Sequence, residues 1–296
     1  PMNLILNFNG IFPLAVLGTV FVPFVVGKSG FVTVSMPLFV WGLVFGSQPH
    51  KEERFLYPIY TLISLSGAVF TNAVFQMCRQ FGITKILIKL TQWSLVAIIG
   101  LVSILRTFSL VENYSAPLSV YAGLSRLNYI GLVSDGLQSK EPINVCTGRE
   151  WYHFPTSFFL PENHRLRFVT SGFDGLLPGD FLEEIDVTVA TLTIPAHMNN
   201  KNVFEHDKVI AFEECDYYVD NSLEADMEKG EYKIVDATKR VADGWELVTC
   251  EKMIKADGKS GLGRLLYIPE FLRQFVPYNV DSMNFCLMRR KDEETK

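Results

Sequence analysis

The first 105 residues contain only eight charged side chains, and this is the feature that most restricts how the chain can fold. The eight are Lys28, Lys51, Glu52, Glu53, Arg54, Arg79, Lys85 and Lys89. Four apolar runs, at about 4–26, 31–46, 55–77 and 86–105, each approach the roughly 20 residues with which a helix crosses a bilayer. They are apolar all round, whereas a soluble amphipathic helix would carry a charged outer face. The sequence therefore predicts an all-α transmembrane region over 1–105 with about four spans.

The remainder of the chain, 106–296, has the charge density of an ordinary globular protein. Alternating or β-branched runs predict strands at 165–173, 186–194 and 245–253. The run at 267–275 predicts a short helix. We therefore expect the membrane region to be followed by a soluble α+β domain.

Several classes of protein fit this composition poorly. The formal charge of −5 and the lack of a basic run with interleaved aromatic residues argue against a nucleic-acid partner. A transporter would need more ionisable residues inside its spans. The chain opens on Pro1 and has no aspartate before Asp135, so we expect it to be the carboxyl-terminal part of a longer protein.

The charges in the short loops predict an orientation in the membrane. Lys28 lies in the first loop, and Arg79 and Lys85 lie in the third, with no acidic residue in either. Loops of this kind are typically cytoplasmic. The segment between the second and third spans, and everything after residue 105, would then face the opposite side. The sequon that begins at Asn113 lies on that side and is a candidate for glycosylation.

A dense polar cluster interrupts the apolar region, within SQPHKEERFLYPIY. Its members are His50, Lys51, Glu52, Glu53 and Arg54. If a helical turn starts at Pro49 with Ser47 as its cap, His50, Lys51 and Arg54 share one face and the two glutamates share the other. A basic face at the membrane boundary suits a lipid phosphate or pyrophosphate. A solvated turn whose long cations reach into water fits the residues equally well.

The string QPHKEERFLYPIY, with FVWGLVF before it and SLSGAV after it, resembles the signature region of the dolichyl-phosphate-mannose-dependent mannosyltransferases, which belong to the GT-C class. It is most similar to the nine-type α-1,2-mannosyltransferases of asparagine-linked glycosylation. Similar strings continue along the chain: NYSAPLSVY, NVCTGREWYHFPTSFFLP, GFDGLLP, IPAHMNN, CDYYVD and GRLLYIPEF. The resemblance covers nearly all of the chain and matches the carboxyl-terminal portion of that family.

The resemblance implies a multi-pass enzyme of the endoplasmic-reticulum membrane, with a GT-C-like helical bundle and a luminal carboxyl-terminal domain. Its donor would be dolichyl phosphate mannose, its acceptor a dolichyl-pyrophosphate oligosaccharide, and the α-1,2 transfer would invert the anomeric carbon without a cofactor. Related α-1,6 or glycosylphosphatidylinositol mannosyltransferases, and a non-catalytic membrane-anchored glycan-binding module, are the alternatives.

The resemblance also implies roles for the polar cluster. His50, Lys51 and Arg54 would bind the phosphate or stabilise it as the leaving group. The family's base is an aspartate near the amino terminus, and no such residue is present in this chain. Glu52 and Glu53 are weak substitutes, because the neighbouring cations would lower a carboxyl pKa and reduce its strength as a base.

The soluble part offers two further candidate sites. The first is a set of possible glycan contacts: Arg149, Trp151, Tyr152 and His153. Plain core packing of the same aromatic stretch is the competing interpretation. The second is a disulfide between Cys146 and Cys215, suggested because both fall in family-like strings, although buried free thiols fit as well. The histidines share no ligand spacing with the cysteines, so we expect no structural metal.

Overall fold

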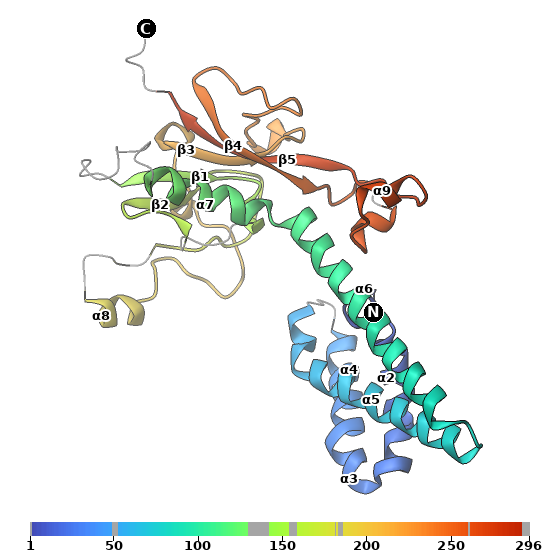
Figure 1. Ribbon diagram of the computed structural model, residues 1–296. Helices are drawn as coiled ribbons and strands as arrows, with labels where there is room; N and C mark the ends of the chain where they lie inside the picture. Colours follow the sequence, from blue (N-terminus) through green and yellow to red (C-terminus); the bar gives the residue numbers. More distant parts are fainter. Residues whose placement is uncertain are drawn as a thin grey trace. The chain divides into compact units, whose positions relative to one another are not determined.

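The computed structural model describes residues 2–48, 53–129, 142–153, 159–180, 182, 186–259 and 261–291 (Figure 1). The chain divides into two compact units. Unit 1 comprises Pro1–Ser109 and Leu265–Val276, and unit 2 comprises Leu110–Arg264 and Pro277–Lys296. A short segment from late in the sequence therefore joins the apolar amino-terminal helices.

Every regular element in the described residues of unit 1 is a helix. In chain order its elements are α1 (Met2–Phe8), α2 (Ile11–Val26), α3 (Lys28–Gly30), a π-helical turn (Phe31–Ser35), α4 (Met36–Ser47), a 3-10 turn (Glu53–Leu56), α5 (Tyr57–Gln80), most of α6 (Lys85–Tyr114) and α9 (Glu270–Arg273). Among the described residues, three helices are long and apolar enough to cross a membrane: Lys28–Ser47, Arg54–Gln80 and Lys85–Tyr114.

The first predicted span, 4–26, is not one continuous helix. Asn9 has a left-handed φ of 50°, which ends α1 and separates it from α2. The 16 residues of α2 extend over only about 24 Å, less than the roughly 30 Å of a bilayer core. At the four predicted spans, the described residues thus form three long apolar helices and one shorter one, α2.

Small residues allow α2 to pack closely on α5. A Cβ added at Gly18 would lie 2.2 Å from the Ser66 carbonyl oxygen, so the two backbones approach as closely as glycine permits. The Ser66 hydroxyl donates to the Ala15 carbonyl at 3.0 Å. Small residues and short hydrogen bonds of this kind are typical of helix packing in membranes. This contact holds α2 against α5, the helix that follows the 3-10 turn.

Unit 2 is built on a five-stranded mixed sheet with the order β2-β1-β3-β5-β4. The strands are β1 (Ile143–Thr147), β2 (His164–Phe168), β3 (Tyr217–Asn221), β4 (Trp245–Ile254) and β5 (Ser282–Arg290). β1 pairs in parallel with β2 and β3, whereas β5 runs antiparallel to β3 and β4. Strand predictions at 165–173 and 245–253, and the short helix near 267–275, agree with β2, β4 and α9.

Both faces of the sheet are covered. Helix α7 (Ala116–Tyr129) lies on one face, where Val120, Tyr121 and Leu124 pack against β3 and β5 (Figure 1). On the other face, Tyr218 and Trp245 pack with the partly buried Phe212. β3 is buried at every position, because it lies at the centre of the sheet between these two layers.

The strand predicted at 186–194 is wrong: this segment forms helix α8 (Val187–Leu192). The Asp186 carboxylate accepts a hydrogen bond from the Thr188 backbone N–H at 2.9 Å and caps the helix. The Thr191 hydroxyl donates back to the Val187 carbonyl at 3.0 Å. These local hydrogen bonds favour a helical turn, and none of the described strands pairs with its β-branched residues.

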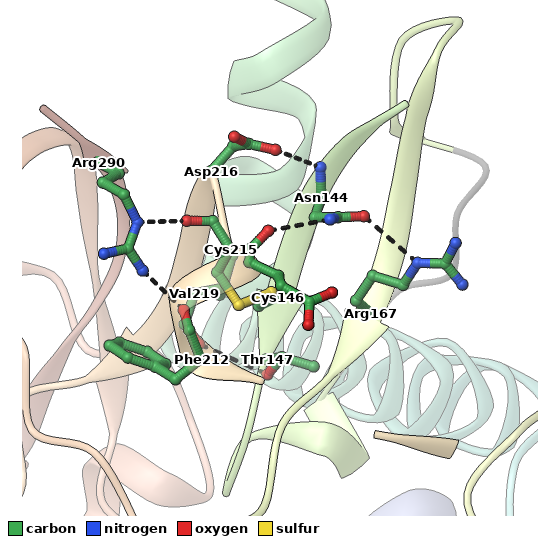
Figure 2. Close-up of a disulfide and its surroundings, with 10 residues drawn as sticks. Asn144, Cys146, Thr147, Arg167, Phe212, Cys215, Asp216, Val219 and Arg290 are labelled. Carbon is green, nitrogen blue, oxygen red and sulfur yellow. Dashed lines mark hydrogen bonds between the residues drawn. A yellow bond between two sulfur atoms is a disulfide. The ribbon is translucent and has the colours of Figure 1, made fainter. Parts of the chain in front are cut away.

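Two disulfides tie unit 2 together. Cys146 on β1 is bonded to Cys215, which lies just before β3, and their Cα atoms are 5.8 Å apart (Figure 2). The second joins Cys250 and Cys286, which are direct cross-strand partners on β4 and β5. The first is the pair suggested by the family-like strings, and the second was not foreseen from the sequence.

Hydrogen bonds surround the first disulfide and fix the entry to β3. Arg290 donates from Nε to the Cys215 carbonyl at 2.8 Å and from Nη2 to the Phe212 carbonyl at 2.6 Å. On the other side, the Asn144 backbone N–H donates to an oxygen of the Asp216 carboxylate at 2.7 Å. Figure 2 shows these groups on both sides of the disulfide. The short segment between Phe212 and β3 is therefore hydrogen-bonded to residues of both β1 and β5.

Candidate functional site

The polar cluster predicted as a phosphate site lies between α4 and α5. His50, Lys51 and Glu52 fall outside the described residues, as does the side chain of Glu53. Arg54 lies in the 3-10 turn Glu53–Leu56, directly before α5. Its side chain is exposed, and its guanidinium carbon is 5.7 Å from the centre of the Phe55 ring.

The helical turn predicted to start at Pro49 lies outside the described residues. Its predicted cap, Ser47, is the last residue of α4, and its hydroxyl donates to the Val44 carbonyl at 2.9 Å. Gln48 then adopts an extended conformation with ψ of 140°, which ends the helix. The regular turn described by the structure begins only at Glu53.

Aromatic packing fixes the turn that carries Arg54. The Trp41 indole donates from Nε1 to the Phe55 carbonyl at 2.6 Å. Phe45 packs between these two residues, with ring centres 4.8 Å from Trp41 and 5.6 Å from Phe55. Because α4 supplies two of the three rings, the turn is held against the end of one apolar helix and at the start of another.

This arrangement places a planar, permanently charged group at the junction of two helices that are apolar enough to lie in a membrane. A guanidinium can donate two parallel hydrogen bonds to a phosphate, which a lysine ammonium cannot do with the same geometry. The Arg54 side chain is thus suited to an anionic lipid headgroup at the membrane surface. A polar turn in solvent would not require the tryptophan and two phenylalanines that fix this one.

Arg149 is a structural residue and is not available as a glycan contact. Its side chain is 9% exposed, and it forms a two-point ion pair with Asp220, which is 1% exposed. The Nε–Oδ1 and Nη2–Oδ2 distances are 2.8 and 3.0 Å. The guanidinium also donates to three backbone carbonyls, those of Asn221, Leu223 and Glu224. All of these contacts lie within unit 2, and they hold the loop after β3 onto β1.

Burial dominates the electrostatics of this pair. It raises the pKa of Asp220 to about 7, and the hydrogen bonds from Arg149 offset only part of the effect. For Arg149, burial alone would lower the pKa, but the hydrogen bond and charge of Asp220 outweigh it, so the pKa is raised. The arginine therefore stays charged, and the carboxyl titrates near neutral pH.

His153 belongs to a second buried polar group. Its Nδ1 lies 2.6 Å from a carboxylate oxygen of Glu150, which is 3% exposed. The other Glu150 oxygen accepts from the Asn221 side chain. The string GREWYH contains Glu150, but sequence reasoning had assigned it no role. The contact with this buried carboxylate fixes the orientation of the His153 ring, which is 29% exposed.

Trp151 and Tyr152 differ in how accessible they are. Trp151 is half-buried and stacks on Phe173, with ring centres 3.9 Å apart. Tyr152 is 55% exposed and lies beside the His153 ring at 4.1 Å. Burial and then the negative charge of Glu150 raise the pKa of Tyr152, so its hydroxyl remains a neutral donor. Of the four proposed glycan contacts, Trp151, Tyr152 and His153 retain accessible surface, and Tyr152 is the most exposed of them.

A pocket of about 450 Å³ lies beside the edge strand β2. Lys208 lines it, and its ammonium donates to the Asp207 carboxylate at 2.8 Å and to the Ala196 carbonyl. Arg167 lines it as well and pairs with Asp180. Both cations among its lining residues are therefore paired with a carboxylate, which makes this pocket poorly suited to a phosphate.

Asn113, the candidate glycosylation site, is buried in the folded chain. It is 6% exposed at the end of α6, and its side-chain amide donates to the Gly263 carbonyl at 3.1 Å. A glycan on Nδ2 would take the place of this hydrogen bond. The packing therefore argues against modification at Asn113. Within the described parts of the chain, no group of three or more His, Cys, Asp or Glu residues could hold a metal ion.

Comparison with known proteins places these features in context. The sequence profile of the Alg9-like mannosyltransferase family matches residues 1–161. The chain is 38% identical over 307 residues to the α-1,2-mannosyltransferase ALG9 of Saccharomyces cerevisiae, covering 100% of this chain and 52% of the relative. It is 33% identical over 309 residues to ALG9 of Homo sapiens, covering 97% of this chain and 48% of the relative. The chain thus spans about half the length of these relatives.

A more distant similarity involves a different linkage. An α-1,6-mannosyltransferase of Arabidopsis thaliana, named for a Man(7)GlcNAc(2)-PP-Dol acceptor, is 26% identical over 226 residues, covering 74% of this chain and 38% of the relative. No solved structure matches the chain.

Proposed function

This chain belongs to the Alg9-like mannosyltransferase family, and we propose that the protein it forms part of is an α-1,2-mannosyltransferase of the endoplasmic-reticulum membrane. The donor would be dolichyl phosphate mannose and the acceptor a dolichyl-pyrophosphate oligosaccharide used for N-glycosylation. The observation that carries the proposal is the similarity to α-1,2-mannosyltransferases along the whole chain, which reaches 38% identity. The lower identity to the α-1,6 enzyme, 26%, favours α-1,2 transfer over the α-1,6 alternative.

In the proposed reaction, an acceptor hydroxyl oxygen attacks the anomeric carbon of mannose from the face opposite the phosphate. A carbon–oxygen bond forms there as the bond to the phosphate oxygen breaks, so the configuration is inverted. A base takes the hydroxyl proton, and dolichyl phosphate leaves with the electron pair. The enzyme must therefore stabilise negative charge on the departing phosphate.

We assign that stabilisation to the turn between α4 and α5. The exposed Arg54 lies in the turn between α4 and α5, both of which are apolar enough to lie in a membrane. The hydrogen bond from Trp41 to the Phe55 carbonyl holds this turn in place. Lys51 and His50, which precede it in the sequence, would add charge and a hydrogen bond to the same phosphate. Glu52 and Glu53 would orient these cations or contact sugar hydroxyls.

The catalytic base is proposed to come from another part of the protein. The family resemblance implies an aspartate in an early luminal loop, and the first aspartate of this chain is Asp135. Glu52 and Glu53 lie beside Lys51 and Arg54, whose charges would depress a carboxyl pKa. The 296 residues of this chain would then supply the part of the active site that binds the lipid phosphate, together with the carboxyl-terminal domain.

The same proposal gives the protein an orientation. Lys28, Arg79 and Lys85 would lie on the cytoplasmic side, and the Arg54 turn and unit 2 on the luminal side. Both disulfides lie in unit 2, which suits an oxidising lumen. The exposed Tyr152 and His153 are then the residues of unit 2 that we propose as contacts for the acceptor glycan.

A reconstituted transfer reaction tests the function. Purified full-length protein would be supplied with dolichyl phosphate mannose and the lipid-linked acceptor, and the product digested with an α-1,2-specific mannosidase. We expect mannose to be added and then removed by this enzyme. Product that resists it would contradict the α-1,2 assignment, and absence of transfer by pure, folded protein would favour a non-catalytic glycan-binding module.

A further inference from the structure

The segment Leu265–Val276 is attached to α6 at one level along the helix. The Tyr267 backbone N–H donates to the Leu105 carbonyl at 2.9 Å. The Arg106 guanidinium donates from Nη1 to the Leu265 carbonyl at 3.3 Å. The rings of Phe108 and Tyr267 lie 5.8 Å apart. These contacts explain why the segment belongs to unit 1 with the apolar helices.

That level corresponds to the end of the apolar run of α6. From Lys85 to Leu105 the helix rises about 30 Å, which equals the thickness of a bilayer's hydrocarbon core. Lys85 at its start and Lys89 one turn later are the two charged residues of this stretch, and Arg106 follows directly after it. If α6 crosses the membrane as proposed above, Leu265–Val276 lies where hydrocarbon meets water.

The segment presents large apolar side chains at this level. Phe271 is 69% exposed and Phe275 is 75% exposed. The two are four residues apart, at α9 and just after it, and so lie on one face of the turn. Leu272, between them, is 40% exposed. Two exposed phenylalanines on one short turn are costly in water but suit the apolar side of a membrane interface.

The one basic residue of the segment, Arg273, is held by other residues of the same segment. Arg273 donates from Nε to the Ile268 carbonyl at 2.8 Å, and its guanidinium lies 5.7 Å from the Tyr267 ring centre. An arginine and a tyrosine beside the end of an apolar helix match the aromatic and basic belt of membrane proteins. The segment thus has an apolar face and a basic, aromatic side that holds it to α6.

We infer that Leu265–Val276 is a membrane-interface anchor whose Phe271 and Phe275 insert among the lipids at the boundary between headgroups and acyl chains. The inference rests on the proposed membrane crossing of α6. Lipid is the occupant favoured here because the segment that carries the phenylalanines is attached to α6 at Leu105, beside Ile104 and Phe108, which are each 55% exposed.

Depth measurement by spin labelling tests this inference. The full-length protein, with Cys78 and other free cysteines replaced and its disulfides intact, would be labelled at Phe275→Cys or at Gln274→Cys in phosphatidylcholine nanodiscs. Accessibility to oxygen, which concentrates in lipid, would be compared with accessibility to a water-soluble nickel chelate. We expect oxygen to exceed nickel at position 275 and the ratio to reverse at the exposed, polar position 274.

Two results would overturn the inference. In the first, the label at position 275 is as accessible to the nickel chelate as the label at position 274. In the second, the label at position 275 is protected from both reagents because protein covers it. An Ile98→Cys label in α6, where the native side chain is 60% exposed, separates the inference from its premise. Lipid at Ile98 without lipid at Phe275 refutes only the anchor. Water at Ile98 refutes the membrane crossing itself.

Discussion

Replacing Arg149 by Met is expected to destabilise unit 2 by about 3–5 kcal/mol, because it removes one partner of a buried ion pair. The structure explains why the effect should lie in this range. Asp220, 1% exposed, would lose both of its hydrogen bonds from the guanidinium. Three backbone carbonyls after β3 would lose theirs as well. Each unsatisfied buried group costs on the order of 1–3 kcal/mol, although relaxation of the loop and entry of water would limit the sum.

A second variant separates these contributions. Replacing Asp220 by Met in the Arg149→Met background removes the unpaired carboxyl, so part of the stability should return. Full recovery is not expected, because the carbonyls of Asn221, Leu223 and Glu224 would remain without their donor.

Pulse proteolysis of the full-length protein in a urea series would measure these changes in the free energy of unfolding of unit 2. The matched control is Lys233→Met, which breaks an exposed pair with Glu224 whose side chains are 32% and 87% exposed. That variant should change stability by about 0–1 kcal/mol. A loss for Arg149→Met no larger than for this control would refute the structural role of the buried pair.

Three further predictions concern other parts of the chain. Gly18→Val should reduce the yield of folded protein in detergent, because the added side chain would push α2 away from Ser66 on α5. Gly42→Val is the control and should not reduce the yield, since a Cβ added there has no atom within 4 Å. Equal yields of the two variants would contradict the packing of α2 on α5. Asn113→Gln should leave the electrophoretic mobility before and after glycosidase digestion unchanged, because this amide is buried; a lost mobility shift would show that the sequon is used. Burial raises the pKa of Asp220 to about 7, so the folded state holds a proton that the unfolded state releases near pH 4. The stability of unit 2 should therefore fall as pH rises from about 5 to about 7. Asp220→Asn should flatten this pH dependence, and an unchanged pH dependence would contradict the assignment.

Features with strong local signals could be predicted from the sequence. The long apolar runs correspond to helices Lys28–Ser47, Arg54–Gln80 and Lys85–Tyr114. The run predicted as a strand at 245–253 corresponds to β4, although burial along this strand does not alternate strictly and its pairing with β5 has an irregularity between Leu247 and Thr249. In these segments, composition and residue type were enough to identify the element.

Other features depend on partners that the sequence does not reveal. The β-branched run after Asp186 forms α8 because a side-chain cap stabilises the helix, and none of the described strands pairs with it. The Cys250–Cys286 disulfide depends on the register of β4 against β5. The role of Arg149 depends on Asp220, far along the chain, and pattern reasoning could not separate that buried pair from a sugar contact.

The position of the Arg54 turn between two apolar helices was predicted correctly, whereas the helical turn predicted from Pro49 lies outside the described residues. The sequence placed a charged cluster between two apolar helices, and the structure has the 3-10 turn there, before α5. It did not reveal that α4 continues to Ser47 or that Trp41 holds the turn through the Phe55 carbonyl. Both depend on how α4 and α5 pack, which short-range patterns do not determine.

The central claim is that this turn binds the phosphate of the lipid-linked donor, and transfer kinetics of Arg54→Ala in the full-length protein test it most directly. Losing two charge-assisted hydrogen bonds of about 1.5 kcal/mol each should lower kcat/KM for dolichyl phosphate mannose about a hundredfold. Arg79→Ala, which removes an arginine from the other end of α5, is the matched control and should keep wild-type kinetics. Wild-type kcat/KM in folded Arg54→Ala protein would contradict the claim.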